Sequence, residues 1–96
     1  MENSHKIDID SIIELVKNQE PDRPELITAL RNSKNGYWSS KGYYRFVDSK
    51  NANEKGAEWQ HDECIVLEQE TESDIVLDML KDGRVGGIEF IGLIEQ

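Results

Sequence analysis

The sequence contains a single cysteine, two prolines and no long hydrophobic run. One cysteine cannot form a disulfide within the chain, which is typical of proteins of the reducing cytoplasm. The first residues lack the basic and apolar regions of a secretory signal peptide. No apolar run approaches the roughly 20 residues that a membrane-spanning helix requires. We therefore expect a cytoplasmic protein with no membrane partner.

Basic residues are also scarce, with 11 Lys and Arg against 20 Asp and Glu in 96 residues. The resulting net charge of −9 argues against a nucleic-acid partner, because the field repels phosphate, and favours a basic partner. A chain of this length is expected to form one domain, residues 1–96.

The first third of the chain, about residues 7–33, has the apolar spacing of two helices. Ser11 and Glu14 fit a capping box at the start of the first helix, although Asp8 or Asp10 is also a possible N-cap. The second helix is predicted over 24–32, with Asp22 as N-cap. The side chains expected to face the core are Ile9, Ile12, Ile13, Val16, Leu26, Ile27 and Leu30.

The remainder, about residues 36–94, is rich in glycine and in strand-forming residues. We expect strands over 43–48 and 58–69, and then a hairpin closed by Asp82-Gly83 as a type I′ turn. Pairing Leu77 with Ile88 gives the hairpin one apolar face, formed by Ile75, Leu77, Met79, Ile88 and Phe90, and one acidic face, formed by Asp74, Asp78 and Glu89. The predicted fold class is α+β, with two N-terminal helices packed on a three- to four-stranded antiparallel sheet.

The stretch "HDECIVLEQETESD", residues 61–74, contains a histidine, a cysteine and six carboxylates. Structural zinc usually takes four Cys or His ligands, and the chain has one Cys and two His. On a regular strand His61 and Cys64, three positions apart, would point to opposite faces. The sequence therefore predicts no metal and no cofactor.

A catalytic Cys–His pair would need a thiol of lowered pKa and a third group to orient the base. Cys64 lies instead beside apolar residues and carboxylates, which disfavour a thiolate. We expect Cys64 to be a buried structural residue, His61 to be an exposed strand residue, and the protein not to be an enzyme. Convergence of His61, Cys64 and a carboxylate in a cleft would favour the enzyme hypothesis.

The acids of this part of the chain are unevenly distributed, with eight carboxylates and no Lys or Arg between Gly56 and Leu80. One interpretation is a solvated turn over 68–74. The other is a docking surface that attracts a cationic cleft and speeds association. The predicted partner-binding residues are Trp59, as an apolar anchor, with Asp62, Glu63, Glu68, Glu70, Glu72 and Asp74.

The segment 34–46 offers an alternative, because it interleaves basic and aromatic residues. Such side chains can stack on single-stranded nucleic acid or hold a small molecule. The residues concerned are Tyr37, Trp38, Lys41, Tyr43 and Arg45. No recognised nucleic-acid-binding motif accompanies them.

The tail "IVLDMLKDGRVGGIEFI", residues 75–91, resembles the final hairpin of a small bacterial domain family of uncharacterised function. The residues that carry this resemblance are Asp78, Asp82, Gly83, Arg84, Val85, Gly87, Ile88 and Glu89. In size and acidity the whole chain resembles the immunity proteins of contact-dependent growth inhibition. That resemblance implies a cytoplasmic, cofactor-free protein that binds and neutralises a cognate toxin domain, often a basic nuclease.

Overall fold

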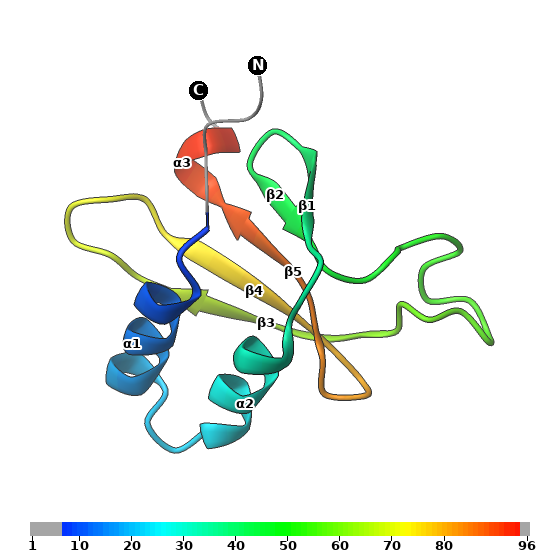
Figure 1. Cartoon of the computed structure of the whole chain (residues 1–96), viewed down its shortest axis with the longest axis horizontal. Helices are drawn as coiled ribbons and strands as arrows, with labels where there is room; N and C mark the ends of the chain where they lie inside the picture. Colours follow the sequence, from blue (N-terminus) through cyan, green and yellow to red (C-terminus); the bar gives the residue numbers. More distant parts are fainter. Residues whose placement is uncertain (1–6, 95–96) are drawn as a thin grey trace.

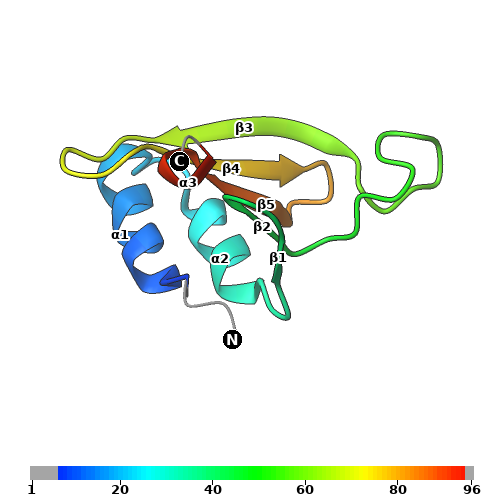
Figure 2. The same cartoon turned by 90° about the horizontal axis from the view of Figure 1, so that it is seen from above.

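The computed structural model describes residues 7–94, which form two helices packed on one face of a five-stranded sheet (Figures 1 and 2). The α+β prediction is confirmed, but the sheet has five strands rather than three to four. No helix in this range is long and apolar enough to cross a bilayer. The elements in chain order are α1 (Ile9–Gln19), α2 (Pro24–Asn32), β1 (Tyr37–Ser40), β2 (Tyr43–Arg45), β3 (His61–Leu67), β4 (Ile75–Leu80), β5 (Val85–Phe90) and α3 (Ile91–Ile94).

The sheet is antiparallel throughout, in the order β1-β2-β5-β4-β3. The strands predicted over 43–48 and 58–69 are shorter in the structure, and β1 was not predicted. β1 is a four-residue edge strand of mostly exposed residues, so it lacks the apolar alternation that marks a half-buried strand. We call the face that carries α1 and α2 the inner face of the sheet, and the opposite face the outer face.

The two helices begin differently. Asp8 is the N-cap of α1, where its carboxylate accepts hydrogen bonds from the Ser11 amide at 3.2 Å and the Ser11 hydroxyl at 2.8 Å. The predicted N-cap of α2, Asp22, is wrong: Arg23 occupies that position and makes no capping hydrogen bond with its side chain. Pro24 at the start of α2 removes one amide that would otherwise need a partner.

The main core lies between the helices and the inner face, as the apolar pattern predicted. Leu30, Leu77 and Ile88 have no exposed surface, so α2 packs on the middle of the sheet. Ile9, Ile27 and Phe90 lie at the margin and are only partly buried. The buried members of this core are Ile12, Ile13, Val16, Leu26, Ala29, Leu30, Ile65, Leu67, Ile75, Leu77, Met79, Val85 and Ile88.

The final hairpin has the predicted register but a different turn. Leu77 lies opposite Ile88, as expected. The Gly83 amide donates a hydrogen bond to the Leu80 carbonyl, and the Leu80 amide donates one to the Arg84 carbonyl. Three residues, 81–83, therefore form the loop. Only Gly83 of the Asp-Gly pair has a positive φ, 92°, whereas a type I′ turn requires two. A register shift between Asp78 and Met79 then restores the predicted pairing.

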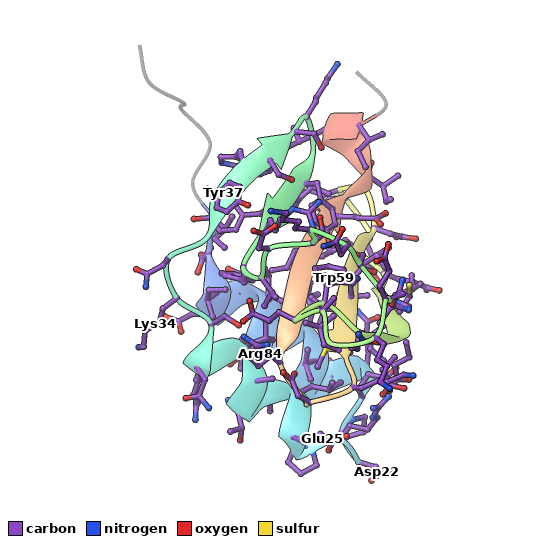
Figure 3. The ribbon with its side chains drawn as sticks, turned by 90° about the vertical axis from the view of Figure 1, so that its right-hand side faces the viewer. Asp22, Glu25, Lys34, Tyr37, Trp59 and Arg84 are labelled. Carbon is purple, nitrogen blue, oxygen red and sulfur yellow. The ribbon has the colours of Figure 1, made fainter. Side chains whose placement is uncertain are left out.

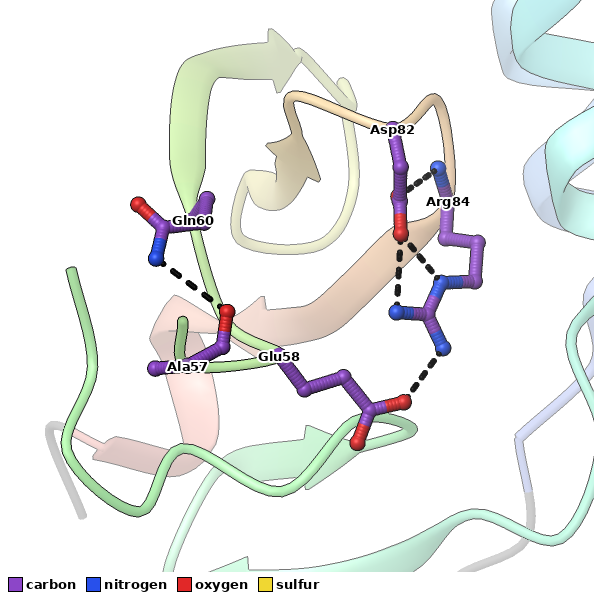
Figure 4. A network of polar contacts seen from close by, with 5 residues as sticks. All are labelled: Ala57, Glu58, Gln60, Asp82 and Arg84. Atoms are coloured by element: carbon purple, nitrogen blue, oxygen red, sulfur yellow. Dashed lines mark hydrogen bonds and ion pairs between the residues drawn. The ribbon is translucent and has the colours of Figure 1, made fainter. Parts of the chain in front are cut away.

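A long loop, residues 46–60, connects β2 to β3 and folds onto one end of the outer face. Trp59 is only 7% exposed and forms a second apolar cluster with Val47 and Leu80 (Figure 3). Arg84 fastens the loop to the β4–β5 turn by ion pairs of 2.8 Å to both Glu58 and Asp82 (Figure 4). The loop therefore buries the tryptophan that the sequence suggested as an exposed anchor.

Candidate functional site

A polar cluster occupies the outer face because β3 is irregular near its start. His61 lies opposite Leu80 and Glu63 opposite Met79, so Asp62 is an extra residue in a β-bulge. The bulge turns His61 to the face on which Cys64 lies opposite Asp78. The prediction that His61 and Cys64 point to opposite faces is therefore wrong.

The three side chains of this cluster are in mutual contact. The Cys64 thiol donates to Asp78 Oδ1 at 3.2 Å, and Cys64 Sγ lies 3.5 Å from His61 Nε2. His61 Nε2 is 3.9 Å from Asp78 Oδ1. The other carboxylate oxygen, Asp78 Oδ2, accepts a 2.7 Å hydrogen bond from the Tyr43 hydroxyl. Asp78 is only 7% exposed, so its buried carboxylate is surrounded by three side chains from two strands, β2 and β3.

The electrostatics of the cluster do not suit a cysteine nucleophile. Cys64 is an exposed residue, contrary to the prediction that it is buried. Desolvation of the thiol, together with its hydrogen bond to Asp78, raises the pKa of Cys64 to about 11. The thiol is therefore protonated near neutral pH, and the carboxylate beside it opposes thiolate formation. Burial and the negative charge of Asp78 also raise the pKa of Glu89, which follows Gly87 on the outer face.

The predicted partner-binding acids fall into two groups at opposite ends of β3 (Figure 1). Asp62 and Glu63 lie at its start, where the Glu63 carboxylate receives two hydrogen bonds from the Arg23 guanidinium. These bonds hold the pKa of Glu63 below its usual range. Glu63 is therefore already paired within the fold. The second group consists of four acids at alternate positions: Glu68, Glu70, Glu72 and Asp74.

That second group lies on the β3–β4 loop, residues 68–74, which is fastened on both sides. The Gln19 side chain donates to the Glu68 carbonyl at 2.6 Å and accepts from the Glu68 amide at 2.8 Å. On the other side, the Ile91 amide donates to the Asp74 carbonyl at 3.2 Å. These bonds position the loop between α1 and α3.

Beside this loop is a hollow of about 650 Å³, which we call the acid-rimmed hollow. Its walls come from the first half of α1, β1, the β3–β4 loop, the start of β4, the end of β5 and α3, and among residues 7–94 they contain no Lys or Arg. Asp8 and Glu72 contribute its carboxylates. Its apolar lining consists of Ile7, Ile12, Leu15, Trp38, Ile75, Phe90, Ile91 and Leu93.

The acids of the β3–β4 loop differ from most other glutamates of the fold in their pairing. Glu14, Glu25 and Glu58 form ion pairs with Lys17, Arg23 and Arg84, respectively. Among residues 7–94, no ion pair involves Glu68, Glu70, Glu72 or Asp74. Within the described range, the loop therefore presents carboxylates that form no ion pair with a Lys or Arg.

The alternative segment, 34–46, does not form one stacking surface. Trp38 packs against Tyr44 and Phe90, with ring centroids 5.1 and 5.5 Å apart, on the inner face. Tyr43 lies on the outer face, where the Arg45 guanidinium lies 4.7 Å from its ring centroid. The aromatic rings thus divide between the two faces, and Tyr37, at 50% exposed, is the most open of them.

Comparisons of the chain with protein-family models, with curated proteins and with solved structures found no match.

Proposed function

We propose that this protein binds a basic protein partner through the acid-rimmed hollow and the β3–β4 loop, as an immunity protein binds and neutralises a toxin domain. The observation that supports the proposal most directly is a set of four carboxylates beside an apolar hollow, none of which forms an ion pair with another residue in the range 7–94. The partner would be cytoplasmic, and the protein would act by occlusion, with no reaction of its own.

The apolar hollow and its charged rim would contribute to binding in different ways. Apolar side chains of the partner would bury surface against Leu15, Trp38 and Phe90, and aromatic or aliphatic anchors in such pockets account for most of the affinity of an interface. Lysines and arginines around those anchors would face Glu70 and Glu72. Charges at a rim mainly accelerate association, because they steer the partner before contact.

The choice of acids follows from the structure. Trp59 is buried and Glu63 is paired with Arg23, so we assign neither a direct contact with the partner. Asp62 lies at the far end of β3 from the β3–β4 loop and is likewise outside the proposed surface. The binding acids are therefore Glu68, Glu70, Glu72 and Asp74, joined by Asp8 at the start of α1.

The test is binding to a panel of basic bacterial nuclease toxin domains, measured by biolayer interferometry at low and at physiological salt. The E70K/E72K variant reverses two charges of the loop. We expect its association rate with a bound domain to fall by about tenfold or more at low salt, since steering changes on-rates by about 10- to 1000-fold.

A matched control is D22K/E54K, which makes the same change of net charge at two exposed positions outside the loop. It should keep most of the association rate. Equal losses in the two variants would show that net charge alone matters, and absence of binding by the wild type to every domain would contradict the proposal. A titration with single-stranded RNA at low salt should show no binding; binding that depends on Tyr37 and Lys41 would support the alternative segment instead.

A further inference from the structure

We propose that His61, Cys64 and Asp78 form a binding site for Zn²⁺ on the outer face of the sheet. The three residues come from β3 and β4, and their potential ligand atoms all lie within 4.8 Å of one another. This site is separate from the acid-rimmed hollow, whose lining includes none of the three. The proposal is therefore independent of the proposed function.

The distances between the ligand atoms are close to those of a zinc centre. With the usual Zn–S, Zn–N and Zn–O bond lengths, ligand atoms of a tetrahedral site lie roughly 3.3 to 3.6 Å apart. The observed separations are 3.5 Å for Sγ–Nε2, 3.2 Å for Sγ–Oδ1 and 3.9 Å for Nε2–Oδ1. A circle through three points so spaced has a radius of about 2.1 Å, which is a zinc–ligand bond length. An ion near the centre of this circle would lie about one bond length from each of the three atoms.

The surroundings of Asp78 are those of a ligand held in place. Oδ2 accepts the hydrogen bond of Tyr43, which leaves Oδ1 directed at Cys64 and His61. Carboxylate ligands of metals are commonly fixed by such a second hydrogen bond, and its loss lowers metal affinity. The Tyr43 ring lies directly over Gly87, where a Cβ atom would come within 2.2 Å of the hydroxyl, so the glycine makes room for this contact.

The ligand set selects the class of metal. Thiolate and imidazole ligands favour Zn²⁺ and its neighbours in the first transition row over Mg²⁺ and Ca²⁺, which prefer oxygen. Three protein ligands leave a fourth position, and no helix of the described residues, 7–94, covers this side of the sheet (Figure 2). An open fourth position of this kind takes water or a group from another molecule. On binding, the ion takes the place of the thiol proton, which is released to solvent.

The first test is titration of the purified full chain with Co²⁺, which replaces Zn²⁺ and reports its ligands by absorption. We expect one ion per chain, a sulfur-to-cobalt charge-transfer band, and displacement by Zn²⁺. C64S should abolish the band, and H61A should weaken binding by tenfold or more. The control H5A removes the other histidine of the sequence and should bind as the wild type does. A wild type without the band, or a C64S variant that keeps it, would overturn the proposal.

A second measurement uses the Cys64 thiol itself as the reporter. Cys64 is the only thiol of the chain, so its alkylation by iodoacetamide can be followed by mass spectrometry. Zn²⁺ should slow this alkylation by tenfold or more, Mg²⁺ should not, and the protection should be lost in H61A. Y43F should lower the affinity for Zn²⁺ by about 10- to 100-fold, the range measured for second hydrogen bonds of this kind. An alkylation rate that Zn²⁺ leaves unchanged would reject the site.

Discussion

The Tyr43 hydroxyl donates a 2.7 Å hydrogen bond to Asp78 Oδ2 and thereby joins β2, next to one edge of the sheet, to β4, next to the other. The bond spans β5, the strand between them, over Gly87. A buried carboxylate is costly unless it is hydrogen-bonded, and Asp78 has two donors in Tyr43 and Cys64. The arrangement makes Asp78 acceptable at 7% exposure on a face that the sequence suggested was simply acidic and solvated.

Replacing Tyr43 by Phe should therefore destabilise the protein more than an ordinary tyrosine-to-phenylalanine change. Hydrogen bonds to charged groups contribute about 1.5 to 3 kcal/mol, against about 0.5 to 1.5 kcal/mol for neutral ones. The control is Y44F, because the Tyr44 hydroxyl donates at 2.9 Å to a neutral acceptor, the Gly36 carbonyl. Urea unfolding at pH 7 measures the unfolding free energy of both variants. If Y43F lost no more of it than Y44F, the hydrogen bond to Asp78 would contribute little.

Gly87 is predicted to be required for the same contact. An alanine Cβ at this position would lie 2.2 to 2.6 Å from three atoms of Tyr43, so the ring must move away from Asp78. We expect G87A to cost about 1 to 3 kcal/mol, the usual range for overpacking. In a Tyr43→Ala background the ring is absent, and the same substitution should cost much less. If G87A lowered the unfolding free energy equally in the two backgrounds, its effect would not come from contact with the Tyr43 ring.

Much of the fold follows from local patterns in the sequence. The apolar spacing of residues 9–16 and 26–30 predicted both helices and their buried faces, since helix amphipathicity depends only on neighbours along the chain. The predicted pairing of Leu77 with Ile88 is present because the register shift between Asp78 and Met79 offsets the extra residue of the turn. β1 was not predictable, because an exposed edge strand of four residues is stabilised by its pairing with β2 rather than by its own pattern.

The polar cluster could not be predicted from the sequence because it depends on the β-bulge at Asp62. A regular β3 would place His61 and Cys64 on opposite faces, and only the extra residue, Asp62, brings them together. The bulge is held by a tertiary contact: the His61 amide donates at 2.8 Å to the Asn53 side chain in the long loop. The same loop buries Trp59, which has no apolar neighbour in sequence between Ala57 and Ile65 apart from Cys64.

The assignment of inner and outer faces is tested by two substitutions on adjacent strands. Leu77 on β4 has no exposed surface and belongs to the main core, so L77A should cost about 2 to 5 kcal/mol. Val66 on the outer side of β3 is 51% exposed, and V66A should change stability by less than about 0.5 kcal/mol. Thermal and urea unfolding measure the stability of both variants. Because a shift of one residue would exchange the two faces, similar losses would contradict the register.

Acid should weaken the ion pair of Asp82 with Arg84, the residue that also contacts Glu58 of the long loop. The hydrogen bond from the Arg84 side chain holds the pKa of Asp82 below its usual range. A carboxylate whose pKa is lowered by folding contributes stability above its unfolded pKa of about 3.9, and that contribution is lost as the pH falls through the folded value. D82N keeps an oxygen for the Arg84 amide but removes the charge, so its unfolding free energy should depend less on pH below about 4.

D22N, at an exposed position outside the ion pairs of the described chain, is the control and should retain the wild-type acid dependence. If D82N and the wild type lost stability in parallel between pH 4 and the acid transition, the Arg84 contacts would not be the acid-sensitive link.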